Sequence, residues 1–174
     1  MPNPLAELTG FPAAPPTAAV AVRPQESSAG AAAPQKAQRI LIVDDDPQIL
    51  DGVVMRLETA GYRTMVARDG FEAARLMLES PPQAIVLDIR LPRCDGMRFL
   101  DWIQQSNFGR SIPVVVLSTR LQDRRRALQA GARFFLGKPY DGHTLLDAIK
   151  RAIADLDSPP HEVVHDERCV PNVN

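Results

Sequence analysis

The sequence predicts an α/β fold in which five parallel strands alternate with five helices in a doubly wound arrangement. Short, almost continuously apolar segments recur through the central part of the chain, which is typical of strands buried on both faces of a parallel sheet. Each of these segments is followed by a stretch that can form a helix, and this alternation favours right-handed crossovers into a single sheet. We expect the strand order 2-1-3-4-5, which places strands 1 and 3 beside the central crevice.

The first strand and helix carry the clearest boundary signals. The segment RILIVD (39–44) is β-branched and apolar and is interpreted as a buried strand. Asp46 can then cap a helix with Pro47 at its first position, and Gly61 follows the expected end of that helix. The inward face of this helix is expected to carry Ile49, Leu50, Val53 and Leu57.

The later segments repeat the alternation. Further strands are expected at 62–67, 84–89, 112–118 and 133–137. Helices are expected at 69–80, at about 95–106, from the end of the fourth strand to Gly131, and from about Asp141 onwards. The last helix is expected to turn Leu145, Leu146, Ile149 and Ile153 inward.

Composition divides the chain into one domain and two tails. Seven of the 16 prolines lie in residues 1–37, together with many alanines, so this segment is expected to be a disordered Pro/Ala-rich N-terminal tail. Residues 38–157 have the size of one compact domain. Residues 158–174 are expected to be a shorter, flexible C-terminal tail.

Charge and cysteine content narrow the environment of the protein. The formal net charge of −1 gives no field that would draw nucleic acid or an anionic membrane. The two cysteines, Cys94 and Cys169, offer neither a disulfide framework nor a zinc spacing. No apolar run is long enough to span a membrane, and the N-terminus lacks the features of a secretory signal. We therefore expect a cytoplasmic protein without membrane insertion.

Polar side chains follow four of the five expected strands. The first strand ends in Asp44 and Asp45, the third in Asp88, the fourth in Ser118, and the fifth in Lys138. Parallel α/β sheets bind their ligands outside the carboxyl ends of the strands. These side chains are therefore expected to meet at one edge of the sheet.

Repulsion between the carboxylates at this edge favours the binding of a cation. Two carboxylates about 4 Å apart repel each other by roughly 4 kcal/mol at an effective dielectric constant of about 20. Mg²⁺ fits, because it binds through one or two carboxylates together with waters and phosphate oxygens, whereas zinc lacks its usual Cys or His ligands here. A carboxylate beside magnesium, a lysine and a hydroxyl is suited to in-line phosphoryl transfer, with Asp88 as the nucleophile.

Four motifs indicate the family that the sequence resembles. ILIVDDDP, VLDIRLPRCDGM, VVVLST and FFLGKPY occur in this order, each at the end of an expected strand. Residues 39 to about 156 thereby resemble a bacterial response-regulator receiver domain of the chemotaxis-regulator type, the phosphoacceptor half of two-component signalling. The resemblance implies a flavodoxin-like (βα)5 fold for the domain at 38–157.

The resemblance also implies a phosphorylation site and a metal site. Asp88 resembles the aspartate that is phosphorylated in the family. The implied ligands of Mg²⁺ are Asp44, Asp45, Asp88 and the backbone carbonyl of Arg90.

A conformational switch is implied as well. Ser118 resembles the switch hydroxyl, Phe135 the switch aromatic, and Lys138 the lysine that binds the phosphoryl group, with a cis bond to Pro139. On phosphorylation, Ser118 would move toward the phosphoryl group, Phe135 would turn inward, and the face formed by the last two strands and their helices would repack. Partner affinity would change only as far as a partner discriminates between the two states.

Three positions in or beside these motifs are expected to tune the access of water to the phosphoryl group and the rate of its hydrolysis. Thr119 is bulkier than the small residue that the family usually has after the switch hydroxyl, and its bulk could narrow access to the phosphoryl group. Arg90 and Arg120 each lie two residues beyond a key residue, at positions that set the rate of hydrolysis in the family. We predict that the two arginines shield the phosphoryl group from water and lengthen its lifetime.

The resemblance implies a signalling phosphoacceptor rather than an enzyme, although one that assists its own phosphotransfer and dephosphorylation. No output domain is recognisable after residue 156, so a stand-alone response regulator is expected. Its expected partners are a histidine kinase or histidine phosphotransfer protein, an unknown downstream protein, and a second copy of the chain through the face of the last helices. The basic helix after Ser118 lacks interleaved aromatics, so nucleic acid is not an expected partner.

Two other interpretations stay open. A haloacid-dehalogenase-like phosphatase also uses an aspartate, magnesium, a hydroxyl and a lysine, but its nucleophile lies in a D-x-D-x-T/V motif, which DDDPQ does not match. A receiver-fold binding module that does not use phosphorylation is compatible with the departure at Thr119. The intact set of key residues favours the receiver over both.

Overall fold

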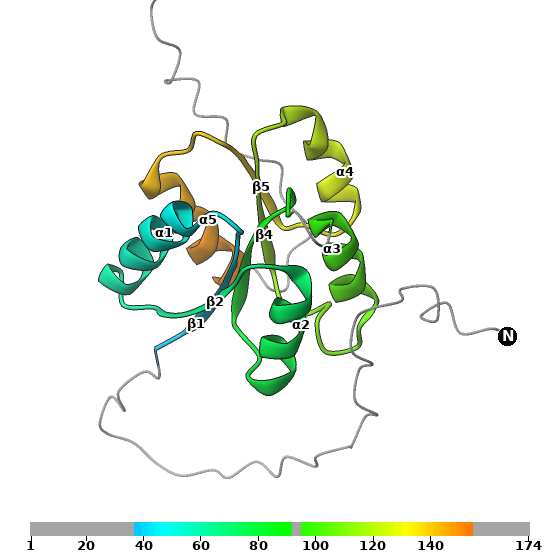
Figure 1. Cartoon of the computed structure of the whole chain (residues 1–174), viewed down its shortest axis with the longest axis horizontal. Coiled ribbons are helices and arrows are strands. Elements are labelled where there is room, and N and C mark those ends of the chain that lie inside the picture. Colours follow the sequence, from blue (N-terminus) through cyan, green and yellow to red (C-terminus); the bar gives the residue numbers. More distant parts are fainter. Residues whose placement is uncertain (1–36, 92–94, 155–174) are drawn as a thin grey trace, which may run out of the picture.

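The computed structural model of the chain, which describes residues 37–91 and 95–154, contains one five-stranded parallel sheet (Figure 1). The strand order is β2-β1-β3-β4-β5, which confirms the predicted topology. The strands are β1 (Arg39–Val43), β2 (Arg63–Ala67), β3 (Ala84–Asp88), β4 (Val114–Ser118) and β5 (Phe134–Gly137). Apart from Ala37, the expected tails at 1–37 and 158–174 lie outside the described residues, as does Cys94.

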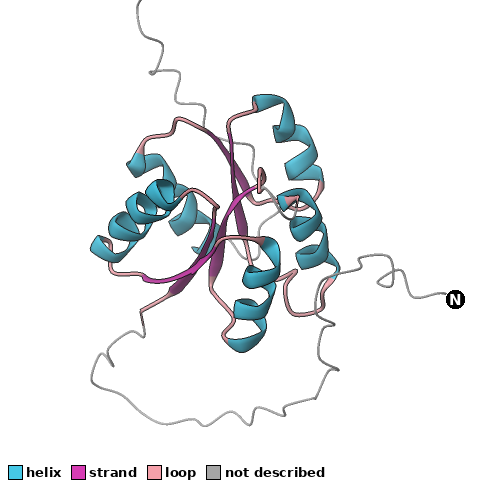
Figure 2. Ribbon diagram, in the orientation of Figure 1, coloured by secondary structure: helices cyan, strands magenta, loops and turns pink. Residues whose placement is uncertain are grey.

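Helices cover both faces of the sheet (Figure 2). On one face lie α1 (Pro47–Thr59) and α5 (Gly142–Ala154), and on the other lie α2 (Gly70–Glu79), α3 (Gly96–Gln105) and α4 (Arg124–Gln129). Within these described residues, no helix combines the length and the apolar character that crossing a bilayer requires.

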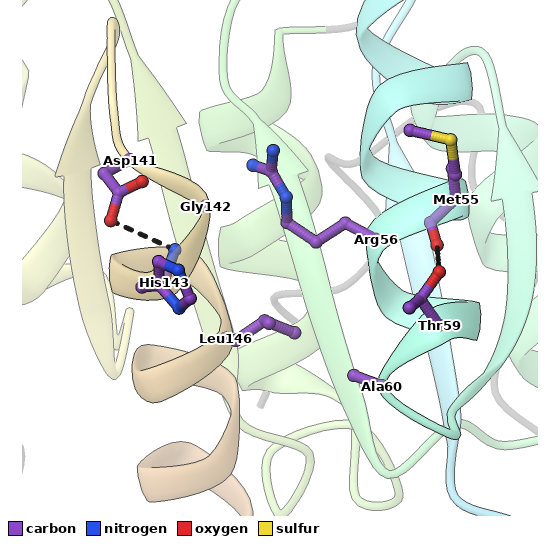
Figure 3. A pocket seen from close by; sticks show the side chains of 8 residues that line it. All are labelled: Met55, Arg56, Thr59, Ala60, Asp141, Gly142, His143 and Leu146. Atoms are coloured by element: carbon purple, nitrogen blue, oxygen red, sulfur yellow. Dashed lines mark hydrogen bonds between the residues drawn. The ribbon is translucent and has the colours of Figure 1, made fainter.

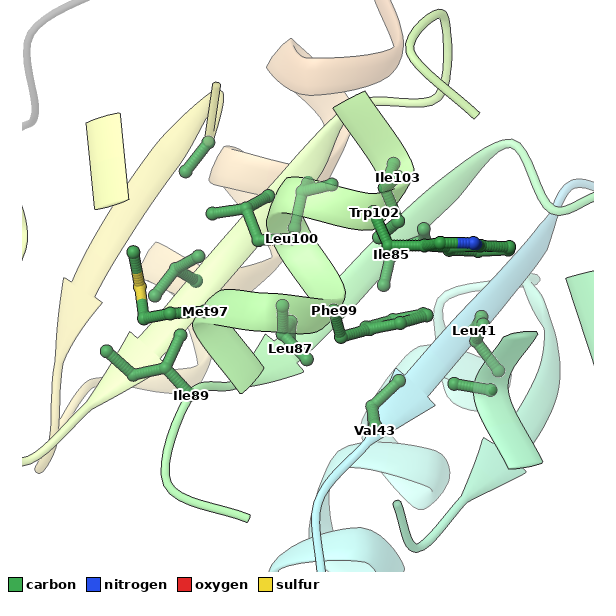
Figure 4. Packing of buried hydrophobic residues seen from close by; sticks show 14 of the residues in the cluster. Leu41, Val43, Ile85, Leu87, Ile89, Met97, Phe99, Leu100, Trp102 and Ile103 are labelled. Atoms are coloured by element: carbon green, nitrogen blue, oxygen red, sulfur yellow. The ribbon is translucent and has the colours of Figure 1, made fainter. Parts of the chain in front are cut away.

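Alternation along the strands divides the core into two clusters. Leu41 and Val43 of β1 pack against α2 and α3, whereas Ile40 and Ile42 pack against α1 and α5. The strands β3 and β4 are buried along their whole length, because a parallel sheet between two helix layers has no solvent-facing side. Figure 4 shows the first of the two clusters, in which Phe99, Leu100 and Ile103 of α3 meet the sheet.

Aspartates begin three of the helices at the predicted positions. Asp46, Asp69 and Asp95 each accept a backbone N–H from the first turn that follows, and Pro47 is the first residue of α1. Gly61 follows the end of α1 with a φ of 90°, a conformation that favours glycine. The first helix therefore begins and ends as its sequence predicts.

The segment after β4 differs from the single helix that the sequence predicts. A 3-10 turn at Leu121–Asp123 comes first, and α4 covers only Arg124–Gln129. Ser118 and Asp123 form local hydrogen bonds here, and such bonds compete with a regular helical ladder. The helix accordingly begins later than residue periodicity suggests.

Candidate functional site

The register of the sheet brings the predicted polar residues to one edge. Val43 pairs with Leu87, Asp88 with Leu117, and Ser118 with Gly137, so four neighbouring strands end at nearly the same level. Asp44 directly follows β1 and Lys138 directly follows β5, while Asp88 and Ser118 are the last residues of β3 and β4. Each strand end therefore contributes one polar group to the same edge.

Lys138 joins two of these carboxylates. Its Nζ donates to Oδ2 of Asp44 at 2.8 Å and to Oδ2 of Asp88 at 2.6 Å. The three side chains are 11%, 2% and 10% exposed, respectively. Few charged side chains are buried to this degree unless they are paired, and here one ammonium compensates two acids. The cluster has one more negative than positive charge and is the most buried group of charges among the described residues.

Burial dominates the ionisation of Asp44. Desolvation raises the pKa of its carboxyl group, although the hydrogen bonds from Lys138 and the Asp46 backbone act in the opposite direction. Burial also disfavours the charge on Lys138, but the two carboxylates outweigh it and raise the pKa of the ammonium above its ordinary value. The ammonium thus stays charged at neutral pH, whereas part of the cost of burying Asp44 is left uncompensated.

Backbone N–H groups fix the second oxygen of each acid. Oδ1 of Asp44 accepts the N–H of Asp46 at 3.0 Å, and Oδ1 of Asp88 accepts the N–H of Arg90 at 2.7 Å. Each carboxylate is therefore held on one side by the main chain and on the other by Lys138. Groups held in this way need little rearrangement when charge develops between them.

The donor set at this edge fits magnesium. Asp44, Asp88 and the main chain after Asp88 supply oxygen atoms, and the exposed Asp45 lies next to Asp44 in the chain. Across residues 37–91 and 95–154 no three or more His, Cys, Asp or Glu side chains gather closely enough to form a metal cluster of their own. Mg²⁺ needs only one or two carboxylates, because waters and phosphate oxygens complete its octahedron. Lys138, which now lies between Asp44 and Asp88, would share them with the ion.

The hydroxyl of Ser118 is buried and already bonded. Its oxygen accepts the N–H of Arg120 at 3.1 Å, and its hydrogen is donated to Oδ2 of Asp123 at 3.3 Å. The three residues expected to tune the site, Thr119, Arg90 and Arg120, are all exposed. The sequence indicated no role for Asp123, because a contact across a turn leaves no spacing signal.

Phe135 already lies inward in this structure. It is 1% exposed and belongs to the cluster under α3 and α4, since its strand position pairs with Val116. Because Phe135 is already buried here, the expected inward turn on phosphorylation would have to begin from an outward position of its ring. The Lys138–Pro139 bond is cis, as expected.

Two hollows border α1, and one of them reaches the site. One of about 310 Å³ reaches Lys138, Pro139 and Tyr140. A larger one of about 470 Å³ lies between α1 and α5 and is not lined by Asp44 or Asp88, and Figure 3 shows Arg56, Asp141 and His143 among its lining residues. Burial, as the largest cause, raises the pKa of Tyr140. The sequence indicated no role for Tyr140, because an aromatic after the motif fits packing equally well.

Comparison with known proteins agrees with the fold. Residues 40–150 match the model of the response regulator receiver domain family. The chain is 34% identical over 131 residues to the DNA-binding dual master transcriptional regulator RpaA of Synechocystis, covering 74% of this chain and 54% of that protein. It is 39% identical over 114 residues to the transcriptional regulatory protein PrrA of Mycobacterium tuberculosis, covering 64% and 48%. The chain thus spans about half the length of the curated relatives that it matches.

Solved structures show the same fold. The chemotaxis response regulator CheY4 of Vibrio cholerae has a TM-score of 0.64 at 27% identity, over 67% of this chain and 99% of that one. The receiver domain of a sensor histidine kinase from Pseudomonas aeruginosa has a TM-score of 0.63 at 32% identity, over 68% and 98%, and holds a magnesium ion in its active-site cleft. The five-stranded topology, the acidic edge and the match over residues 40–150 together show that this chain belongs to the response-regulator receiver family of two-component signalling.

Proposed function

We propose that Asp88 accepts a phosphoryl group from a histidine kinase or a histidine phosphotransfer protein. Receiver domains are signalling phosphoacceptors that partner with histidine kinases rather than enzymes in the usual sense. The proposal is supported most directly by the pairing of Lys138 with both Asp44 and Asp88, whose side chains are almost fully buried at the carboxyl ends of the strands. A lysine held there can neutralise charge on a group that is transferred to Asp88.

In the proposed phosphoryl transfer, each of these side chains has a role. An oxygen of Asp88 forms the bond to phosphorus while the phosphorus–nitrogen bond of the donor phosphohistidine breaks, and the imidazole keeps the electron pair and takes up a proton. Lys138 binds an oxygen of the phosphoryl group, and the N–H of Arg90 holds the other oxygen of Asp88. Asp44, Asp45, Asp88 and the main-chain carbonyl of Arg90 would hold magnesium, which when bound supplies positive charge to the phosphoryl oxygens.

Phosphorylation would change the surface formed by α4, β5 and α5, and partner proteins would recognise that change. The phosphoryl group adds about 1.5 to 2 negative charges, and Ser118 is the hydroxyl that we assign to bind it. Phe135, a residue of β5 in the same core cluster as Ala127 of α4, would couple this change to the outer face. A stand-alone regulator would act by binding a downstream protein or a second copy of the chain through this face, without contacting nucleic acid.

Incubation with a small phosphodonor and magnesium, followed by intact-mass measurement, tests the proposal. We expect one added phosphoryl group that is labile to hydroxylamine and absent in Asp88→Asn. Asp147→Asn is a matched control, because that exposed carboxylate on α5 pairs with Arg151 at 3.6 Å and lies outside the site. No adduct with small donors or with kinases would favour the phosphorylation-independent module. Turnover of a phosphomonoester that Asp44→Asn abolishes and Asp88→Asn spares would favour the phosphatase.

The exposed positions around the site provide a second test. We propose that Arg90 and Arg120 shield the phosphoryl group from water and that Thr119 narrows access to it. The double variant Arg90→Ala/Arg120→Ala should then release phosphate several-fold faster, in an assay that follows the decay of the phosphorylated chain. Release that is unchanged or slower would contradict the shielding role.

A further inference from the structure

The hydroxyl of Ser118 has both of its hydrogen-bonding roles filled. It accepts from the N–H of Arg120, and it must be the donor toward Asp123, since an ionised carboxylate only accepts. Ser118 itself has no exposed surface, whereas Asp123 is partly exposed, so both bonds lie at the boundary of the core. A hydroxyl has a single hydrogen, and in this structure Ser118 donates that hydrogen to the Asp123 carboxylate.

The backbone at Asp123 forms a tight turn. Asp123 ends the 3-10 turn, and its N–H donates to the carbonyl of Arg120 at 3.1 Å. Its side chain makes no capping hydrogen bond at the start of α4. Helix capping, which is the usual reason for an aspartate before a helix, does not account for this residue.

We propose that Asp123 is a positioning residue that competes with the phosphoryl group for the Ser118 hydroxyl. The inference rests on the proposed function, in which Ser118 donates to a phosphoryl group on Asp88. Because the hydroxyl has one hydrogen, it serves either the Asp123 carboxylate or the phosphoryl oxygen, and never both. The bond to Asp123 therefore stabilises the unphosphorylated arrangement and opposes the switched one.

The same competition links the site to the outer face. Leu121, in the turn that Asp123 ends, lies over Gly137 of β5, where an added Cβ would be 2.7 Å from Cδ2 of Leu121. Leu121 is 61% exposed. When Ser118 leaves Asp123, the turn loses one of its hydrogen bonds to the buried strand, and the side chain of Leu121 gains freedom on β5. A partner that contacts this turn would then discriminate between the two states.

Binding of beryllofluoride, a mimic of the phosphoryl group, tests the competition in the presence of magnesium. Calorimetric titrations would compare the wild-type chain with Asp123→Ala, Asp123→Asn, Ser118→Ala and the double variant Ser118→Ala/Asp123→Ala. Asp123→Ala should bind about five-fold more tightly, which corresponds to about 1 kcal/mol. Asp123→Asn should gain less, because its amide oxygen still accepts the hydrogen. In the Ser118→Ala background, removing Asp123 should change nothing.

Two outcomes would overturn the role of Asp123. One is unchanged affinity in both Asp123 variants, with the fold verified by circular dichroism. The other is an equal gain with and without Ser118, which would assign the effect to the lost negative charge. If Asp123→Ala does not fold, Asp123→Asn with its Ser118→Ala partner carries the same comparison. Failure of the wild-type chain to bind beryllofluoride would instead overturn the proposed function, and this inference with it.

Discussion

Charged side chains lie at both ends of the strands, the carboxyl edge and the amino edge of the sheet, but in different surroundings. At the carboxyl edge, Asp44 and Asp88 are almost fully buried and share one lysine. At the amino edge, Arg39 donates to Ser80 and to the carbonyl of Pro81, in partly exposed contacts that water can replace. The charges of the first edge therefore interact strongly with one another, whereas those of the second edge are screened by water.

This difference in burial distinguishes the candidate site around Lys138 from the stabilising contacts of Arg39. Buried charges cost free energy unless they are paired, and one ammonium for two acids leaves the carboxyl edge short of positive charge. Such an edge is adapted to binding a cation or a group held by cations. At the amino edge, the contacts of Arg39 are partly exposed hydrogen bonds that help to stabilise the sheet.

The largest effect is expected where the carboxyl edge is tightest. A Cβ added to Gly96 would lie 2.5 Å from Cα of Ile89 and 2.6 Å from the carbonyl oxygen of Asp88, both of which are backbone atoms. Gly96→Ala should lower the free energy of unfolding by about 3 kcal/mol, because the main chain after β3 must shift. Chemical denaturation measures this change.

The matched control is the same substitution on an open helix surface. Gly52 lies in α1 with no atom within 4 Å of an added Cβ. Gly52→Ala should therefore raise the free energy of unfolding by about 0.5 to 1 kcal/mol. A smaller loss for Gly96→Ala than for a typical surface change would show that the edge is not rigid.

The second effect tests the buried lysine directly. Lys138→Met leaves Asp44 and Asp88 without their shared cation and should lower the free energy of unfolding by about 2 kcal/mol, somewhat less than for a fully enclosed pair. Magnesium should restore part of this loss if it binds the same carboxylates. Denaturation with and without magnesium measures both effects, and a variant as stable as the wild type would contradict the comparison.

The amino edge should respond less to a comparable change. Arg39→Met removes the contacts to Ser80 and Pro81 but leaves no buried charge behind. The expected loss is about 0.5 to 1 kcal/mol, the net value of an ordinary hydrogen bond. Equal losses for Arg39→Met and Lys138→Met would remove the distinction between the edges.

The smallest effect concerns the two tyrosines: Tyr62 lies at the amino edge, just before β2, and Tyr140 lies near the carboxyl edge, just after Lys138. Burial raises the pKa of Tyr62, which follows α1, and is the largest cause of the raised pKa of Tyr140, which lies near Lys138. The unfolded chain loses these protons first, so stability should fall as pH rises from 10.0 through the folded-state values. Ultraviolet titration of the folded chain, with Tyr140→Phe to isolate Tyr62, would contradict this if both tyrosines ionised at or below 10.0.

The fold was within reach of the sequence, because local patterns and the layer architecture agree with each other. Buried strands such as RILIV, caps such as Asp46 and a stop such as Gly61 each fix an element without reference to distant residues. The gathering of Asp44, Asp88, Ser118 and Lys138 at one edge was also predictable, because a parallel sheet brings its strand ends together. The segment after β4 was predicted as one helix, since its periodicity does not reveal that Ser118 and Asp123 bond to each other.

What the sequence alone determined is thus the order of the strands and the set of polar side chains at their ends. The tertiary structure decided how those side chains are arranged: Lys138 pairs with two acids, Phe135 lies inward, and the Ser118 hydroxyl donates to Asp123. The physical reason is that burial and hydrogen bonding depend on groups far apart in the chain, such as Lys138 and Asp44, whereas strand and helix patterns depend on near neighbours.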